Sequence, residues 1–319
     1  MADNSLYIRA YAKINLYLDV TGRRDDGYHL VDLVMQSVGL HDGLSISRAD
    51  GPNDTLSIVD ADGTGMFAGL ECDERNLVIR AVNALRSGYP ERFPAGCGLD
   101  IRLEKRIPSQ AGLAGGSADA AAALIAVNRL LSLGLTEAEL EETALSLGAD
   151  VPFCVRCGTL RAEGIGEILS PLPPMPDCTL VIAKPEGSAS TRDIYTAIDN
   201  EDIAHPDYER MAAALGSGNI AAVSAALANI MEPITAARVP DVSRIISDML
   251  SSGALGSRMT GSGSAVFGIF DDRLTAEGCA GMLKEAGYVR SVYVTAPISA
   301  EEAGALRFVP EEQTGSAQA

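Results

Sequence analysis

The sequence predicts a mixed α+β protein of two domains. Its 319 residues are enough for two hydrophobic cores without support from disulfides. The first half alternates strands and helices around a glycine-rich turn, and the second half follows the split strand and helix order of a ferredoxin-like layer. We expect an N-terminal domain over residues 1–160, a C-terminal domain over 161–305 and a disordered tail over 306–319.

Residues 8–20 alternate apolar and polar side chains with period two, which predicts a half-buried strand. Lys13 and Asn15 are neighbours on the polar face of this strand. A solvated lysine on an outer face is the ordinary outcome of such a pattern, so the alternation alone leaves their role open.

Further elements of the first half follow from apolar patterning. The stretch TGRRDDGYHLV is a turn that leads to strand-like segments at 33–40 and 44–49, and a Gly- and Asp-rich loop covers 50–75. Asn76 begins a helix that ends at Gly88, and residues 97–108 form a strand that leads into the glycine-rich turn.

Asp150 follows the next predicted helix. Thr136 and Glu139 form a capping box at the start of that helix, and Gly148 stands where it is expected to end. Pro152 favours extended geometry at the residue before it, so Asp150 lies on a short constrained connection. Alone, Asp150 is equally a turn or capping aspartate.

The second half begins with a strand at 178–185, after a Pro-rich connection at 170–178. Three helices are predicted next, then a second glycine loop (RMTGSGSAV), a strand, a helix and a last strand. The predicted helices cover 205–218, 219–230, 240–253 and 274–287, and the last two strands 265–270 and 291–298.

Composition restricts the partners. The formal net charge of −18 argues against nucleic acid or an anionic membrane, which both require a basic face. No apolar run reaches the roughly 18 residues of a membrane helix, and the N-terminus has no export signal, so we expect a cytoplasmic protein. Oligomeric state is left open between monomer and homodimer.

The six cysteines are scattered, which favours reduced thiols over a disulfide framework. Cys154 and Cys157 form a lone C-x-x-C with no second pair for zinc. If PFCVRCGTL is extended, these two thiols point to opposite faces, so we expect a structural role and no metal site.

A strand, a run of small residues and a helix start are the geometry of a phosphate site. The first amides of a helix lack intrahelical partners, and glycine lets an anion approach the backbone closely. A tight packing turn gives the same pattern. Neither the Walker P-loop pattern nor the dinucleotide pattern G-x-G-x-x-G occurs at this position.

The stretch PSQAGLAGGSADAAAAL resembles the phosphate loop of the GHMP kinases. Further matches, in the family's order, are AYAKINLYLDVTGRRDDGYHLV, ERNLVIRA, LGADVPF, AEGIGEIL and MTGSGSAVF, so the resemblance covers about residues 10–300. It implies a ribosomal protein S5 domain 2-like N-terminal domain and a ferredoxin-like C-terminal domain, with the active site between them. It also implies ATP-dependent phosphorylation, with Mg²⁺, of the 2-hydroxyl of 4-diphosphocytidyl-2-C-methyl-D-erythritol in isoprenoid precursor synthesis.

The resemblance assigns roles to particular residues. Asp150 is implied as the general base and Lys13 as its catalytic partner, while Asn15, Tyr28 and His29 are implied to contact the cytidyl substrate. The residues implied for the nucleotide are Asn76, Lys105, Pro108, Ser109, Gln110, Ala111, Gly112, Leu113, Ala114, Gly115, Gly116, Ser117 and Ala118.

The roles of the second glycine motif and of Lys184 stay open at this point. Gly261, Ser262 and Gly263 either shape the active-site cleft or form a plain turn, and Lys184 either faces the substrate diphosphate or is solvated.

The glycine loop departs from the family pattern. Gln110, Ala111, Ala114 and Ala118 replace glycines or a serine that the family usually carries, which predicts altered nucleotide affinity before lost activity. The alternatives are another GHMP kinase of the mevalonate or homoserine type, or a noncatalytic nucleotide-binding protein. The DGYH pair argues against the first, and the presence of Lys13 and Asp150 against the second.

Overall fold

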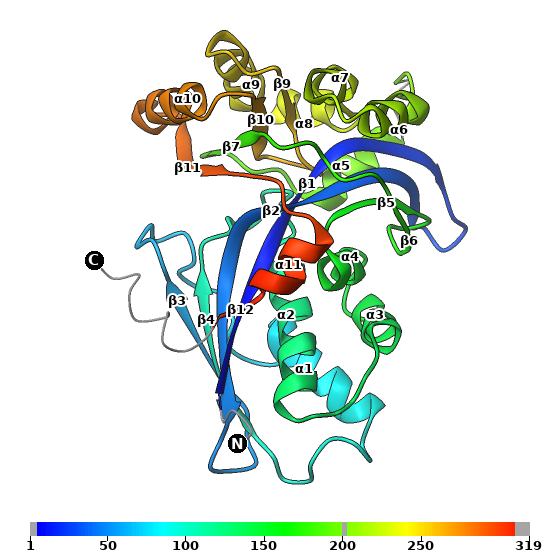
Figure 1. The fold of residues 1–319 in the computed structure, drawn as a ribbon, viewed down its shortest axis with the longest axis vertical. Helices are drawn as coiled ribbons and strands as arrows, with labels where there is room; N and C mark the ends of the chain where they lie inside the picture. The colour runs from blue at the N-terminus through cyan, green and yellow to red at the C-terminus, as the bar shows by residue number, and fades with distance from the viewer. Residues whose placement is uncertain (1–4, 200–202, 310–319) are drawn as a thin grey trace.

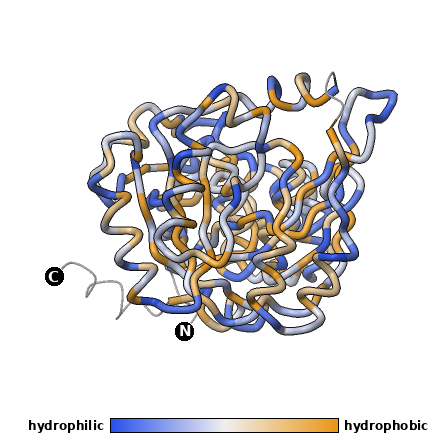
Figure 2. Tube along the Cα trace, turned by 90° about the horizontal axis from the view of Figure 1, so that it is seen from above, coloured by the Kyte–Doolittle hydropathy of each residue, from blue (hydrophilic) through white to orange (hydrophobic). Residues whose placement is uncertain are grey.

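The computed structural model describes residues 5–199 and 203–309, which form two sheets, each with its own helices (Figure 1). The larger sheet has the path β12-β1-β2-β4-β3, and the smaller has the order β11-β7-β10-β9. This is the predicted two-part α+β architecture. In Figure 2, seen from above, outer segments alternate between hydrophobic and hydrophilic residues, as expected for elements with one buried face.

A long antiparallel hairpin of β1 and β2 is the centre of the larger sheet. Figure 1 shows it running from the lower part of the molecule to the helices above, where β8 pairs with β1 in parallel. The strands of this sheet are β1 (Ser5–Arg23), β2 (His29–Arg48), β3 (Thr55–Asp60), β4 (Leu99–Lys105), β5 (Thr159–Glu163), β6 (Ile168–Pro171), β8 (Ala228–Asn229) and β12 (Phe308–Val309).

Four helices lie together on one side of this sheet in Figure 1: α1 (Leu77–Gly88), α2 (Gly115–Leu130), α3 (Glu137–Leu145) and α4 (Val151–Arg156). The alanines of α2 explain its central place, because small side chains let its neighbours approach closely. Every residue of α2 from Ala118 to Leu124 is buried, and α2 contacts both β1 and α1. Its first turn is thereby held at one point of the molecule.

The smaller sheet confirms the ferredoxin-like prediction. Its four strands are all antiparallel, and their chain order is strand, helices, two strands, helix, strand. The elements are β7 (Thr179–Pro185), α5 (Thr191–Ile198), α6 (Tyr208–Ser217), α7 (Ile220–Ala226), α8 (Glu232–Arg238), α9 (Asp241–Ser251), β9 (Gly256–Met259), β10 (Val266–Phe270), α10 (Arg273–Glu285) and β11 (Val289–Thr295). The following helix, α11 (Ala300–Leu306), packs instead on the larger-sheet part, where Ala303 is buried with Tyr11 and Cys157.

Several local predictions were wrong. The strand at 8–20 is not half-buried, because helices cover one face and the second half covers part of the other, so Lys13 and Asn15 are both buried. The two segments predicted after the turn are one strand, β2, and the 50–75 loop contains β3. The PFCVRC stretch is the helix α4 rather than extended chain.

The end of the chain also differs from the prediction. Leu306 closes α11, and Phe308–Val309 forms β12, which pairs with β1, so the tail does not begin at residue 306. Residues 310–319 lie outside the described residues. The domain division at residue 160 stays a prediction, but the chain changes sheet between Pro171 and Thr179, at the Pro-rich connection.

No helix within 5–199 and 203–309 combines the length and apolar character needed to cross a bilayer.

Candidate active site

The glycine loop presents unpaired backbone amides. Helix α2 begins at Gly115 after Ala114, whose left-handed backbone (φ 56°) supplies no side-chain cap. The first-turn amides of Gly115, Gly116 and Ser117 therefore lack a capping partner, whereas the Ala118 amide donates to Ala114 O at 2.9 Å. No acidic side chain lies in this first turn. These features fit a bound anion.

A pocket of about 280 Å³ lies over these amides, which we call the loop pocket. It is lined by Leu77, Lys105, Ile107 and residues 108–117. The Ala111, Leu113 and Ala118 side chains are buried in the core, so only the backbone of these residues is available to a ligand. The Ala118 amide, in addition, already donates a hydrogen bond within α2. Because the Ala118 side chain is buried, a hydroxyl group at this position would point into the core and not into the loop pocket.

Lys105, which was predicted to contact the nucleotide, instead forms ion pairs in a buried cluster beneath the glycine loop. Its Nζ pairs with the carboxylates of Asp42 and Asp119, and all three side chains are buried. Asp42 also accepts the Ile107 amide at 2.8 Å. Burial acts against the charged ammonium, but Asp119 and Asp42 outweigh it and hold the pKa of Lys105 above its usual value. Burial raises the pKa of Asp119.

Lys13 and Asp150, far apart in sequence, come together. Lys13 Nζ lies 3.9 Å from Asp150 Oδ2 and donates to Asn15 Oδ1 at 2.6 Å. The Lys13 amide donates to Leu113 O at 3.2 Å, which attaches the strand to the glycine loop. Asn15 Nδ2 is buried and has no hydrogen-bond partner in the described part of the chain. An unpaired buried donor at this point suits an acceptor oxygen of a ligand.

Asp150 stands at the position immediately before α4, and its carboxylate makes no capping bond. The extended geometry expected at Val151 was wrong, because this residue is the first of the helix, where Pro152 in the first turn is tolerated. The side chain is about one-third exposed. It is therefore free to accept a proton or hydrogen bond from a ligand while Lys13 stays buried behind it.

The second glycine motif packs directly on the first. Thr260 Oγ1 accepts the Asn15 amide at 3.0 Å and lies 3.1 Å from Gly112 O. Gly112 has φ 76°, and a Cβ there would overlap the Thr260 carbonyl. Ala265 N donates to Ala111 O at 3.2 Å. Gly261–Gly263 thus packs against the first glycine loop, while its role in shaping an active-site cleft stays a prediction.

Tyr28 and His29 line a larger pocket, which we call the aromatic cleft, of about 1030 Å³. Tyr28 is 61 % exposed, while His29 stacks on Tyr195 with ring centroids 4.7 Å apart. The residues lining this cleft are Arg23, Asp26, Gly27, Tyr28, His29, Arg80, residues 145–149, Ile165, Arg192, Tyr195 and Thr196. The cleft reaches Ala149, next to Asp150. Burial, and secondarily Asp150, raise the pKa of Tyr195 to about 12.

Asn76 and Lys184, two candidate ligand contacts, form hydrogen bonds to the protein itself. Asn76 caps α1: its Oδ1 accepts the Val78 amide and its Nδ2 donates to Glu71 O. Lys184 is neither solvated nor in the aromatic cleft, since its buried Nζ donates to the carbonyls of Pro185 and Gly187. Burial lowers the pKa of Lys184.

Sequence patterning missed Tyr195 and Thr260. Tyr195 lies in STRDIYTAI, where no helix was predicted, and its ring reaches the cleft only because α5 packs beside the β1–β2 hairpin. Thr260 stood within the MTGSGSAVF match, but nothing in its spacing indicated the bonds to Asn15 and Gly112.

Two family models match the chain. The GHMP kinases N terminal domain matches residues 76–158, and the GHMP kinases C terminal domain matches residues 211–289. Among curated proteins, a 4-diphosphocytidyl-2-C-methyl-D-erythritol kinase of Lachnospira eligens is 41% identical over 292 residues, covering 91% of this chain and 98% of the relative. One of Desulfitobacterium hafniense is 41% identical over 297 residues, covering 92% and 97%.

Solved structures agree. A crystal structure of 4-(cytidine 5'-diphospho)-2C-methyl-D-erythritol kinase superposes with a TM-score of 0.74 at 30% identity, covering 92% of this chain and 99% of that one. A homoserine kinase of Cytophaga hutchinsonii has a TM-score of 0.69 at 18% identity, covering 94% and 97%. That second likeness concerns the fold alone.

Proposed function

The chain belongs to the GHMP kinases, in the 4-diphosphocytidyl-2-C-methyl-D-erythritol kinase family, and we propose that it phosphorylates the 2-hydroxyl of that cytidyl alcohol with ATP. The observation that carries the proposal is the position of the Lys13–Asp150 pair. Lys13 bonds to the glycine loop, and Asp150 adjoins the end of the aromatic cleft. In this family the reaction serves isoprenoid precursor synthesis, and we propose the cytoplasm as its location.

We propose that Asp150 is the general base. Its carboxylate takes the proton of the 2-hydroxyl as that oxygen forms a bond to the γ-phosphorus, while the bond to the bridging oxygen breaks and ADP leaves. Lys13 Nζ lies 3.9 Å from the carboxylate, where its positive charge stabilises the negative charge that develops on the reacting oxygens. Asn15 Nδ2, buried and unpaired, is placed to bind an oxygen of the reacting groups.

The amides of Gly115, Gly116 and Ser117 are the proposed triphosphate site. These amides have no capping partner and lie at the start of helix α2, facing the loop pocket. The first turn of α2 carries no acidic side chain that would repel a phosphate group. Among the described residues no three His, Cys, Asp or Glu side chains converge as a metal site. We propose that the Ser117 hydroxyl would be an oxygen ligand for a Mg²⁺ ion bound with the triphosphate, and that such an ion would supply neutralisation of the phosphate charge.

The aromatic cleft is the proposed cytidyl site. Tyr28 offers an exposed ring for stacking, and Tyr195 with His29 forms a second flat surface. Arg192, in the same lining, supplies a cation for the diphosphate. The protein would then read the base in the aromatic cleft and leave the alcohol beside Asp150.

ADP release measured with the cytidyl alcohol, mevalonate and homoserine in parallel tests this function. We expect turnover with the cytidyl alcohol only. Turnover confined to mevalonate or homoserine would replace the substrate while leaving the kinase chemistry in place. ATP binding without turnover of any alcohol would favour the noncatalytic alternative.

A further inference from the structure

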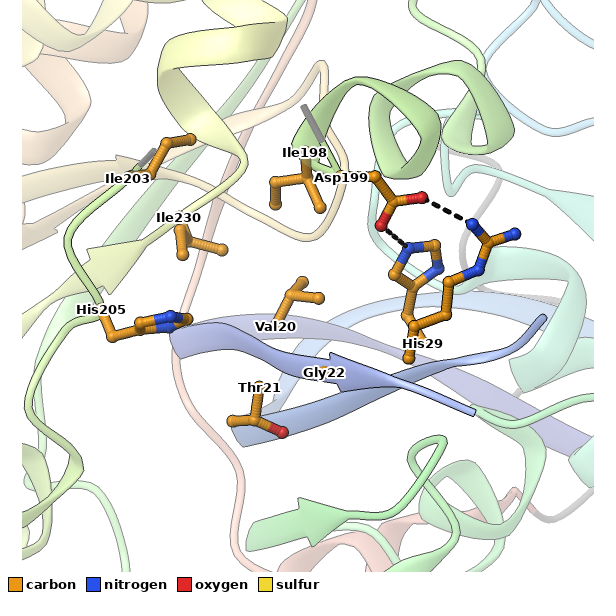
Figure 3. A pocket seen from close by; sticks show the side chains of 10 residues that line it. Val20, Thr21, Gly22, His29, Ile198, Asp199, Ile203, His205 and Ile230 are labelled. Atoms are coloured by element: carbon orange, nitrogen blue, oxygen red, sulfur yellow. Dashed lines mark hydrogen bonds and ion pairs between the residues drawn. The ribbon is translucent and has the colours of Figure 1, made fainter. Parts of the chain in front are cut away.

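A smaller pocket beside the aromatic cleft shows what holds His29 in place (Figure 3). Its volume is about 250 Å³, and it shares Arg23 and His29 with the cleft. Asp199, the residue after α5, points to the hairpin from the other side of this pocket in Figure 3. One oxygen, Oδ1, lies 2.7 Å from His29 Nε2, and the other, Oδ2, accepts Arg23 Nη1 at 2.9 Å.

The imidazole of His29 is thereby constrained on two sides. Tyr195 stacks on its face, Asp199 meets its Nε2, and only 11% of the side chain is exposed. A carboxylate at this distance accepts a hydrogen bond, so Nε2 carries the proton. Nδ1 has no recorded partner in residues 5–199 or 203–309. In the neutral ring with Nε2 protonated, Nδ1 is a hydrogen-bond acceptor.

We propose that Asp199 is a positioning residue that fixes the tautomer of His29, so that Nδ1 accepts a hydrogen bond from the exocyclic amino group of the substrate's cytosine. The inference rests on the proposed function, because it needs a cytosine in the aromatic cleft. Uracil carries an oxygen where cytosine carries the amino group. Two acceptors would then face each other, so Asp199 sets the preference for a cytidyl over a uridyl substrate.

The hydrogen bond to Arg23 explains why an aspartate, and not an asparagine, suits position 199. Two donors, Arg23 and His29, use the two oxygens of one carboxylate. An asparagine has one oxygen, so in D199N the arginine and the histidine compete for it. When the amide oxygen serves Arg23, its NH₂ group faces Nε2, which must then accept, and the proton moves to Nδ1.

The tautomer is tested directly on the free protein. The chain has three histidines, so ¹⁵N-histidine spectra are simple, and His29→Gln identifies the His29 signals. We expect a protonated Nε2 and an unprotonated Nδ1 at pH 8, and a shift toward protonated Nδ1 in D199N. Identical His29 spectra in the two proteins would overturn the inference, and this measurement does not depend on substrate identity.

Selectivity is tested by kcat/KM for the cytidyl alcohol and its uridyl analogue. In D199N we expect the cytidyl-to-uridyl ratio to fall about 10-fold, the scale of one hydrogen bond, mainly through KM for the cytidyl substrate, with KM for ATP unchanged. A merely structural role would lower both substrates equally, and that result would overturn the inference. The matched control is D193N, the same change at an exposed site on α5, which should keep the wild-type ratio.

The two proposals fail differently. If the wild-type protein does not phosphorylate the cytidyl alcohol, the proposed function is wrong. If it does, and D199N keeps the wild-type ratio, only the role of Asp199 is wrong.

Discussion

Asp150 shows how a single residue changes meaning once its neighbours are known. The local sequence pattern fits a turn or capping aspartate, but in the structure its carboxylate makes no capping bond and lies 3.9 Å from the buried Lys13. A carboxylate that makes no capping bond and is mostly shielded from solvent is a candidate for a catalytic or binding role. The same holds for Asn15, whose unpaired Nδ2 is buried.

Replacing Asp150 with Asn removes the proposed base but keeps its shape. We expect kcat to fall by roughly 10²–10⁴-fold, the usual contribution of a general base, with little change in KM for ATP. Glu142→Gln, at an exposed site on the neighbouring helix α3, should behave as wild type. Steady-state ADP release decides the matter, and wild-type kcat in D150N would remove the base assignment.

Tyr28 is the cleft residue that can be changed with least damage to the fold, because 61% of it is exposed. Tyr28→Ala removes a stacking surface, so KM for the cytidyl alcohol should rise about 10- to 100-fold, on the scale of 1–3 kcal/mol per stacked base. Tyr28→Phe keeps the ring and should restore most of the affinity. Weakened ATP binding in Tyr28→Ala, measured by titration, would contradict the cytosine assignment.

At the scale of elements, the two glycine motifs work as one unit. Residues 110–114 contain three positive-φ positions, Gln110, Gly112 and Ala114, so the loop is folded tightly. Thr260 and Ala265 attach it to the C-terminal half. An alanine at the left-handed position 114 costs on the order of 1–2 kcal/mol relative to glycine in backbone terms. The departure from the family pattern at this residue therefore has a definite structural consequence.

Gly112→Ala tests that packing. The added methyl would overlap the Thr260 carbonyl at a positive φ, so we expect a loss of at least about 1–2 kcal/mol in the free energy of unfolding and a higher KM for ATP. In Gly216→Ala the added methyl meets nothing within 4 Å, and the site lies in helix α6. That control should be neutral or stabilising by up to about 1 kcal/mol. Urea unfolding and ATP kinetics compare them, and equal effects would refute the predicted contact.

Across the whole molecule, the buried Lys105–Asp42–Asp119 cluster joins β4, β2 and α2. It connects the strand before the glycine loop to the helix after it. One buried ammonium pairs with two buried carboxylates, and Asp119 Oδ1 has no partner in the described part of the chain. Burial accordingly favours the neutral form of Asp119.

This cluster predicts a pH dependence of stability. Because the pKa of Asp119 is raised above its ordinary 3.8 in the folded state, the folded protein binds a proton that the unfolded chain has lost. The contribution of Asp119 to the free energy of unfolding is therefore full below that value and falls as pH rises above it. Asp119→Asn should unfold with a flatter pH dependence in urea titrations run upward from pH 4. Parallel curves for the two proteins would contradict the raised pKa.

Features that depend on periodicity or on residues a few positions apart were predictable. They are the strand at 8–20, the glycine loop before α2, the capping box at Thr136 and the ferredoxin-like order of the second half. The family followed from six short stretches in order. Burial of Lys13 and Asn15 was not predictable, since it depends on elements that cover both faces of β1. Helical α4 was missed because the proline lies in its first turn, where proline is tolerated.

By itself, the sequence determined the family, the glycine loop before α2 and the ferredoxin-like order of the second half, and it predicted Lys13 and Asp150 as candidate site residues. The tertiary structure brings Asp150 next to Lys13, as the family resemblance implied. It alone decided that Thr260 contacts Gly112, that Lys105 lies in an ion cluster beneath the loop, and that Asp199 bonds to His29. The physical reason is separation along the chain. Patterning reports neighbours within a few residues, whereas these contacts join residues from 14 to 170 positions apart.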